Sequence, residues 1–286
     1  MSDINPNFEI HIRKRKGLIP FDIQELKRYK DLLVLLLYRD FSSRYKQTVL
    51  GPAWYVIQPL IQTLVFTVIF GKVAQMPTDG LPPLLFYLAG LLAWNYHATV
   101  LQATGNTFQV NANLFGKVYF PRLIVPFSAT ISQLIGWVIQ FFTFVVIYTY
   151  YMTMTPFGKE AVISWNALFL PLIIIQAGMI GLGTGFWLSA LTAKYRDLQH
   201  IQQFLVQIWM YITPLVYPLS MIPEKWQWLA ILNPMSMVVE SLKVCLLNAG
   251  SFNLQYMLLS LLVTFLLFFS GLVLFGKVER TFVDTV

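Results

Sequence analysis

Charged residues are absent from six long stretches of this chain, and apolar side chains dominate each stretch. Every stretch holds at least 25 residues, whereas a helix needs about 20 residues to cross a bilayer. A charge in the middle of a bilayer costs about 2.5–3.5 kcal/mol on insertion scales, so each stretch is a candidate for one crossing. The stretches are Gln47–Gly71, Gly80–Gly116, Leu123–Gly158, Ala161–Ala193, Leu198–Pro223 and Val244–Gly276.

This pattern predicts an all-α membrane protein with six transmembrane helices within residues 47–286. A membrane β-barrel would instead show alternating segments of ~10 residues, which the chain lacks. The composition agrees, because 57% of the residues are hydrophobic, 12% are charged and the mean hydropathy is +0.62, outside the norm of soluble domains. The predicted spans are 53–71, 84–105, 124–151, 165–191, 199–217 and 253–275.

The residues before the first span are rich in basic side chains. Residues 1–20 are predicted to be a basic cytoplasmic tail, either solvated or bound to anionic headgroups through Arg13–Lys16. Over residues 21–46 apolar positions recur at helical steps, and Asp22 and Glu25 have the spacing of a capping box. This pattern predicts an amphipathic helix in the membrane interface, with a soluble helix that packs on a partner as the alternative.

Two segments between the predicted spans are unusual for loops. Residues 218–252 are too apolar for an open external loop, yet prolines divide them into pieces too short to span. We predict two short helices there, at 224–232 and 235–248, that dip into or cap the outer membrane face. The loop 106–122 mixes amides with Phe108 and Phe115. Its spacing fits either a short helix that offers apolar side chains to a cytoplasmic partner or a segment packed at the interface.

The distribution of positive charge predicts the orientation. Sixteen of the twenty Lys and Arg residues fall on the side that carries both termini, and the positive-inside rule places that side in the cytoplasm. This asymmetry accounts for the net charge of +7, so no nucleic-acid partner is required. The single cysteine, Cys245, excludes an intramolecular disulfide and a cysteine metal cluster.

Motifs for catalysis or cofactor binding are incomplete. Gly271–Lys277 has the spacing of a phosphate-binding loop, but Val278 stands where Ser or Thr is required and no strand precedes it. The histidines are isolated, and no carboxylate pair or nucleophile motif is found. We therefore expect no enzymatic activity, no cofactor and no metal site. Small residues of the fourth span favour close helix packing over dinucleotide binding: Gly178, Gly181, Gly183, Gly185 and Ser189.

Polar side chains follow one face of two predicted spans at steps of four. A buried amide is costly unless it finds a hydrogen-bond partner. The stripes are therefore either contacts that join neighbouring helices or the lining of a pore for a polar, ring-shaped substrate. A sugar is such a substrate, because its hydroxyls pair with amides and its CH faces stack on aromatic rings. The stripes are Trp54, Gln58 and Gln62 in the first span, and Gln199, Gln203, Gln207 and Tyr211 in the fifth.

Four segments resemble, in order, the membrane subunits of ATP-binding-cassette polysaccharide exporters, which include O-antigen, capsule and teichoic-acid permeases. The likeness covers nearly all of the chain after about residue 30 and leaves the tail 1–20 outside. The segments are SRYKQTVLGPAWYVIQPL (43–60), LFGKVYFPRLIVP (114–126), KYRDLQHI (194–201) and TPLVYPLSMIPEKWQWLAILNPMSMVV (213–239).

The resemblance implies a permease domain at 47–286, a homodimer of this chain, and two copies of a separate ATPase subunit that bind ATP and magnesium. It implies an inner-membrane location, with membrane lipids and a lipid-linked polysaccharide as partners. We expect O-antigen as the cargo, with capsular polysaccharide and teichoic acid as the alternatives within the family. A drug or lipid exporter would need a dry aliphatic pore, and a membrane glycosyltransferase would need acidic metal ligands, so both are disfavoured.

The resemblance also implies roles for particular residues. The loop 106–122 becomes the segment coupled to the ATPase, and the short helices at 224–248 become an outer gate. The first and fifth spans line the channel, which agrees with the two polar stripes. The channel residues are Trp54, Tyr55, Gln58, Gln62, Gln203, Gln207 and Tyr211; the coupling residues are Phe108, Leu114, Phe115, Lys117 and Arg122; the gate residues are Trp226, Trp228 and Met235.

Overall fold

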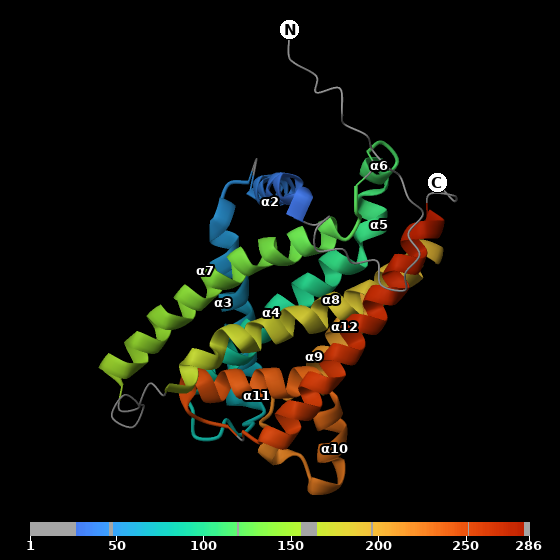
Figure 1. Ribbon diagram of the computed structural model, residues 1–286. Coiled ribbons are helices and arrows are strands. Elements are labelled where there is room, and N and C mark those ends of the chain that lie inside the picture. The colour runs from blue at the N-terminus through green and yellow to red at the C-terminus, as the bar shows by residue number, and fades with distance from the viewer. Residues whose placement is uncertain are drawn as a thin grey trace.

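The computed structural model describes residues 27–45, 48–118, 120–155, 165–195, 197–250 and 252–282. Within these ranges the chain is helical and contains no strand (Figure 1), which confirms the predicted all-α class. Its α-helices are α2 (Lys30–Tyr45), α3 (Trp54–Phe66), α4 (Pro83–Gly105), α5 (Thr107–Val110), α6 (Ala112–Phe115), α7 (Ile124–Met154), α8 (Leu170–Lys194), α9 (Leu198–Ile212), α10 (Glu224–Leu232), α11 (Pro234–Leu247) and α12 (Leu254–Phe282).

Five helical segments are long and apolar enough to cross a membrane, and each coincides with a predicted span. In the first, a 3₁₀ turn (η1, Gly51–Ala53) leads into α3, and a π-helical segment (η2, Thr67–Val73) follows it. In the fourth, a 3₁₀ segment (η4, Trp165–Phe169) precedes α8. The five segments are Gly51–Val73, Pro83–Gly105, Ile124–Met154, Asn166–Lys194 and Leu254–Glu279.

The helix found at the predicted fifth span, 199–217, is shorter than that span. The helix α9 has 15 residues and ends at Ile212, which corresponds to about 22 Å at 1.5 Å per residue and is short of the ~30 Å hydrocarbon core. It ends there because Thr213 precedes Pro214 and is extended, with ψ 138°, as a residue before proline prefers to be. Irregular backbone and a 3₁₀ turn (η5, Leu219–Met221) continue to α10.

The two short helices predicted before the last span are present as α10 and α11. They meet at Asn233 and are bent by 97° relative to each other, and Pro234 begins α11. The Asn233 side chain caps α11 by accepting a hydrogen bond from the Met235 backbone N–H at 3.1 Å. Together the pair is either one broken span or a re-entrant segment.

The helix predicted at 21–46 is described from residue 27 onward, and residues 1–20 lie outside the described ranges. The helix α2 packs against α7 and buries Leu36, whereas Val34, Leu35 and Tyr38 are exposed. Apolar side chains therefore lie on more than one side of α2, and the predicted segregation into one apolar face stays unconfirmed.

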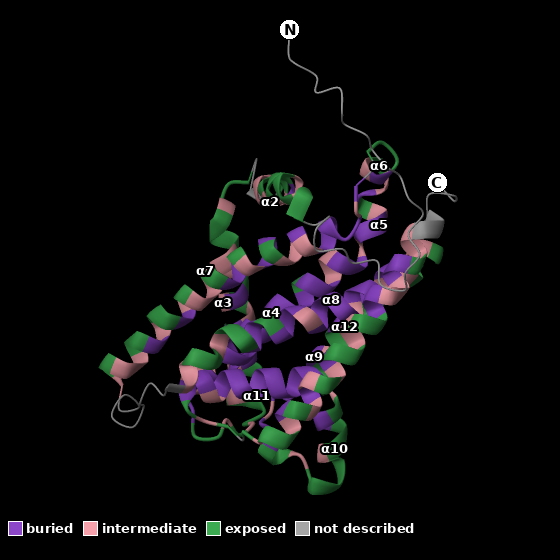
Figure 2. Ribbon diagram, viewed as in Figure 1, coloured by how far each residue is buried: buried purple, intermediate pink, exposed green. Residues whose placement is uncertain are grey.

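The core is built around α4 and α8. In the apolar stretch of α4, 83% of the residues are buried, compared with 17% in the first span. Figure 2 shows the buried residues concentrated in α4, α8 and α11. Glycines allow α8 to approach both of its main neighbours, as their clustering in the fourth span predicts. A Cβ at Gly181 would lie 2.9 Å from the His97 carbonyl of α4, and one at Gly183 would lie 2.8 Å from the Phe268 backbone of α12.

We predict that Gly183→Ala destabilises the fold, because the added methyl meets backbone atoms of α12 that cannot rotate away. The expected cost is about 1–3 kcal/mol, as for other overpacked cores, measured as a lower midpoint of thermal aggregation in detergent. Gly116→Ala is the control, since a Cβ there would lie 3.7 Å from its nearest neighbour. Equal midpoints for the two variants would contradict this account of α8 packing.

Candidate functional site

A cavity of about 450 Å³ lies between α3, α4, α7 and α9. Side chains with amide or hydroxyl groups line much of it, together with five aromatic side chains, three of them Trp and two Tyr. Among the described residues that line it, none carries a formal charge. This is an unusual surface to find between helices whose other faces are apolar, because an amide in hydrocarbon requires a hydrogen-bond partner.

Six of the seven predicted channel residues line this one cavity. The first stripe belongs to α3 and the second to α9, and the fold places them facing a common space. Gln62 donates a long hydrogen bond to the Met210 sulfur at 3.9 Å, which joins α3 to α9. Tyr211 is outside the cavity lining and is 45% exposed. The lining residues predicted from the sequence are Trp54, Tyr55, Gln58, Gln62, Gln203 and Gln207.

Two further polar stripes complete the cavity, and the sequence analysis missed both. Each follows one helical face at steps of three and four, which is the same signal as in α3 and α9. The stripes lie in the second and third spans, where long apolar runs obscure a few amides. They are Asn95, Thr99 and Gln102 of α4, and Gln133, Trp137 and Gln140 of α7.

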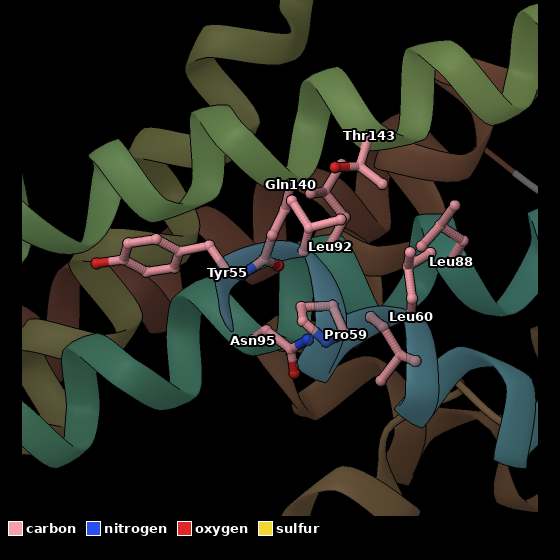
Figure 3. Close-up of a pocket in the computed structure, with 10 residues that line it drawn as sticks. Tyr55, Pro59, Leu60, Leu88, Leu92, Asn95, Gln140 and Thr143 are labelled. Carbon is pink, nitrogen blue, oxygen red and sulfur yellow. The ribbon is translucent and has the colours of Figure 1, made fainter. Parts of the chain in front are cut away.

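The cavity narrows at one side into a gap of about 10 Å³. Figure 3 shows Gln140 of α7 and Asn95 of α4 directed toward Pro59 of α3, with Leu92 beside Gln140 and Leu88 farther along α4. The boundary between the amide surface and the apolar core therefore lies within α4. Its polar stripe faces the cavity, and the opposite face, which includes Val100 and Thr104, packs on the α8 glycines.

Other glutamines of the bundle join helices instead of lining the cavity. Gln176 of α8 is buried and donates to the Ser260 hydroxyl of α12 at 2.8 Å. Gln202 of α9 is buried and donates to the Gln102 carbonyl of α4 at 3.3 Å. In contrast, Gln203 and its neighbour in the stripe, Gln207, are exposed. The bundle therefore contains two sets of amides, one paired between helices and one that lines the cavity.

The predicted coupling segment forms two short helices, α5 and α6, at the same end of the bundle as α2 (Figure 1). Phe108 is 1% exposed and stacks on Phe275 of α12 with ring centroids 4.7 Å apart. Phe115 is also buried and lies 6.0 Å from Phe108. These rings anchor the segment to the bundle, which differs from the expectation that they project toward a partner.

The remaining coupling residues divide between the interior and the surface. Arg122 is buried, donates from Nη1 to the Glu279 carbonyl at 2.8 Å, and lies over the Phe115 ring at 5.3 Å. Leu114 is partly buried, and Lys117 is exposed. The outward surface of this segment is formed by the exposed residues Asn113, Gly116, Lys117 and Val118.

The predicted gate residues lie at the opposite end of the bundle. Trp226 and Trp228 of α10 are 52% and 55% exposed, whereas Met235 at the start of α11 is completely buried. The side chain of Asn233 links this end to α9, because it accepts from Trp209 Nε1 at 2.9 Å and donates to the Thr213 hydroxyl at 2.9 Å.

Apolar helices of membrane-spanning length around an uncharged polar cavity indicate a multi-pass membrane protein. Residues 31–247 match the ABC-2 type transporter family, and the chain belongs to that family. This agrees with the resemblance found in the sequence segments.

Three relatives illustrate the family. The O-antigen export system permease protein RfbA of Klebsiella pneumoniae is 28% identical over 254 residues, which cover 89% of this chain and 94% of the relative. The protein of the same name from Myxococcus xanthus is 28% identical over 221 residues, covering 77% and 81%. The polysialic acid transport protein KpsM of Escherichia coli is 23% identical over 250 residues, covering 86% and 92%.

We predict that Gly136 is required for the position of Tyr55, because a Cβ at residue 136 would overlap the tyrosine ring. Gly136→Ala should cost about 1–3 kcal/mol in the wild-type background and much less in a Tyr55→Ala background, where the ring is absent. Thermal midpoints of the four proteins in this double-mutant cycle measure the coupling. Additive effects would show that the two residues are not in contact.

Proposed function

We propose that this chain is the membrane subunit of an ATP-driven exporter of lipid-linked polysaccharide, with O-antigen as its cargo. The observation that carries the proposal is the cavity in which four helices contribute amides, hydroxyls and aromatic rings. Neutral amides hydrogen-bond sugar hydroxyls, and Trp and Tyr rings pack on apolar sugar faces. The names of the RfbA relatives support O-antigen. The KpsM relative, a polysialic acid transport protein, supports a polysaccharide other than O-antigen, and capsular polysaccharide is our second candidate.

The proposed assembly is a homodimer that binds two copies of a separate ATPase subunit, which holds ATP and magnesium. In support of the dimer, Gln58, Gln203 and Gln207 belong to the cavity lining and are nevertheless exposed, so the cavity is open on one side. A second copy facing it would close a passage lined by amides from both chains. We place the complex in the inner membrane with both termini in the cytoplasm, following the positive-inside rule.

The ATPase is proposed to bind the outward surface of α5, α6 and the following turn. Val118 is 54% exposed, and Lys117 beside it is also exposed. The rigid attachment of this segment through Phe108 and Arg122 would transmit a movement of the ATPase to α4 and α12. At the other end, α10 and α11 are proposed to act as the outer gate, with Trp226 and Trp228 facing outward.

Removal of cavity amides should impair export without preventing assembly. A neutral hydrogen bond contributes about 0.5–1.5 kcal/mol, so we expect Gln58→Leu combined with Gln207→Leu to slow export about tenfold. Gln199→Leu is the matched control, because Gln199 is exposed on α9 outside the cavity. Surface polysaccharide in a strain without its own permease, together with co-purification of the ATPase, gives both measurements. Wild-type export by the double variant would place the passage elsewhere.

A charge on the proposed ATPase surface should weaken the complex, since a carboxylate in an apolar contact is left without a partner. We expect Val118→Asp to reduce co-purification of the ATPase and to abolish coupled hydrolysis. Val73→Asp is the control, because Val73 is 77% exposed at the other end of the first span. Phe108→Ala should instead lower thermal stability. If Val118→Asp retains the ATPase as well as Val73→Asp does, the contact lies on another surface.

A further inference from the structure

A second polar cavity, of about 300 Å³, lies beneath α2 at the end of the bundle that carries α5 and α6. It shares Thr99, Gln102 and Gln133 with the amide cavity described above. The two spaces therefore meet along one polar wall of α4 and α7. The volume is at the lower end of the about 300–1,000 Å³ typical of small-molecule sites.

The chemistry of this second cavity suits a neutral, hydroxyl-rich occupant. Its only cation among the described lining residues, Arg39, is paired with Asp40 at 2.8 Å and also donates to the Asn111 side-chain oxygen at 3.3 Å. The paired charges leave little net attraction for a phosphate. Asn106 Oδ1 is buried and accepts no hydrogen bond within the described part of the chain, so it is available to a hydroxyl donor after a small side-chain rotation.

The wall of this cavity includes the segment to which the ATPase is proposed to bind. Asn106, Val110 and Asn111 line the cavity, while Asn113 and Val118, a few residues further on, face outward. The Arg39–Asn111 hydrogen bond also ties α2 to this segment. An occupant would thus touch the inner side of a short segment whose outer side contacts the ATPase.

We propose that this cavity is a second, cytoplasmic-side subsite for the glycan, and that its occupancy is sensed by residues 106–111. The inference rests on the proposed export function and adds to it a place where cargo and ATPase meet the same segment. A ligand shifts a conformational equilibrium by its difference in affinity for the two states. Glycan in this subsite therefore favours the arrangement of α5 and α6 that it contacts best, and the ATPase responds to that arrangement.

Cysteine protection in the assembled complex tests the subsite. Ala103→Cys, in a Cys245→Ser background, places a thiol in the cavity wall. Val73→Cys, in the same background, places one at an exposed site at the other end of the first span, outside both the cavity and the proposed ATPase surface. The probe is lipid-linked polysaccharide extracted from an export-deficient host strain. At about tenfold above its Kd, it should slow modification of Ala103→Cys by a water-soluble thiol reagent about tenfold, because the accessible fraction falls as 1/(1 + [L]/Kd). Val73→Cys should react equally with and without the probe.

A variant that fills the cavity with a larger apolar side chain provides a second test, and this substitution removes no hydrogen bond. Ala129→Leu adds bulk within the cavity and should raise the polysaccharide concentration needed for half-maximal ATPase stimulation about tenfold, which corresponds to 1.4 kcal/mol. An unreactive or unprotected Ala103→Cys in a complex that exports polysaccharide would overturn the subsite and leave the export function intact. A wild-type complex that neither exports nor responds to the polysaccharide would overturn the export function, and the subsite with it.

Discussion

The close approach of α8 to α4 on one side and to α12 on the other is the constraint on which the rest of the structure depends. Gly181 and Gly185 lie against α4, and Gly183 lies against the α12 backbone. Without a hydrophobic force between helices in lipid, such contacts stabilise a bundle through dispersion and through small residues that allow backbones to approach. Because α4 commits one face to α8, its opposite face is free to carry amides, and that face forms the wall of the cavity.

The same physical rule separates the two uses of glutamine in this protein. An amide buried between helices must be paired, and Gln176 meets this requirement through the Ser260 hydroxyl. An amide that lines a cavity can be paired by water or by a passing hydroxyl, so Gln203 and Gln207 need no fixed protein partner. Under the proposed function, amides of the second kind would make weak, repeated contacts with the polysaccharide, which suits a polymer that has to slide.

The sequence predicted six spans, five of which coincide with helices of spanning length. It also predicted the two short helices before the last span and the α3 and α9 sides of the cavity, because uncharged length and helical spacing report directly on burial in lipid. It did not predict the direction in which Phe108 and Phe115 point, since a short helix shows too few turns to define a face. It also overlooked the stripes of α4 and α7. Gln133 and Gln140 are seven residues apart with Trp137 between them, and this spacing would have revealed the second of those stripes.

The buried charged pair of α11 satisfies part of the irregular backbone that follows the short helix α9. Where α9 ends, the backbone is irregular, and such backbone is tolerated at membrane depth only when protein groups satisfy it. Lys243 of α11, itself 1% exposed, donates to the Pro214 carbonyl at 3.1 Å and to Glu240 at 3.3 Å. Asn233 bonds to Trp209 in the last turn of α9 and to Thr213, where the irregular stretch begins. The helix α9, which has one face on the cavity, is thus tied at its C-terminal end to the junction of α10 and α11, so a shift of α9 has to carry that junction with it.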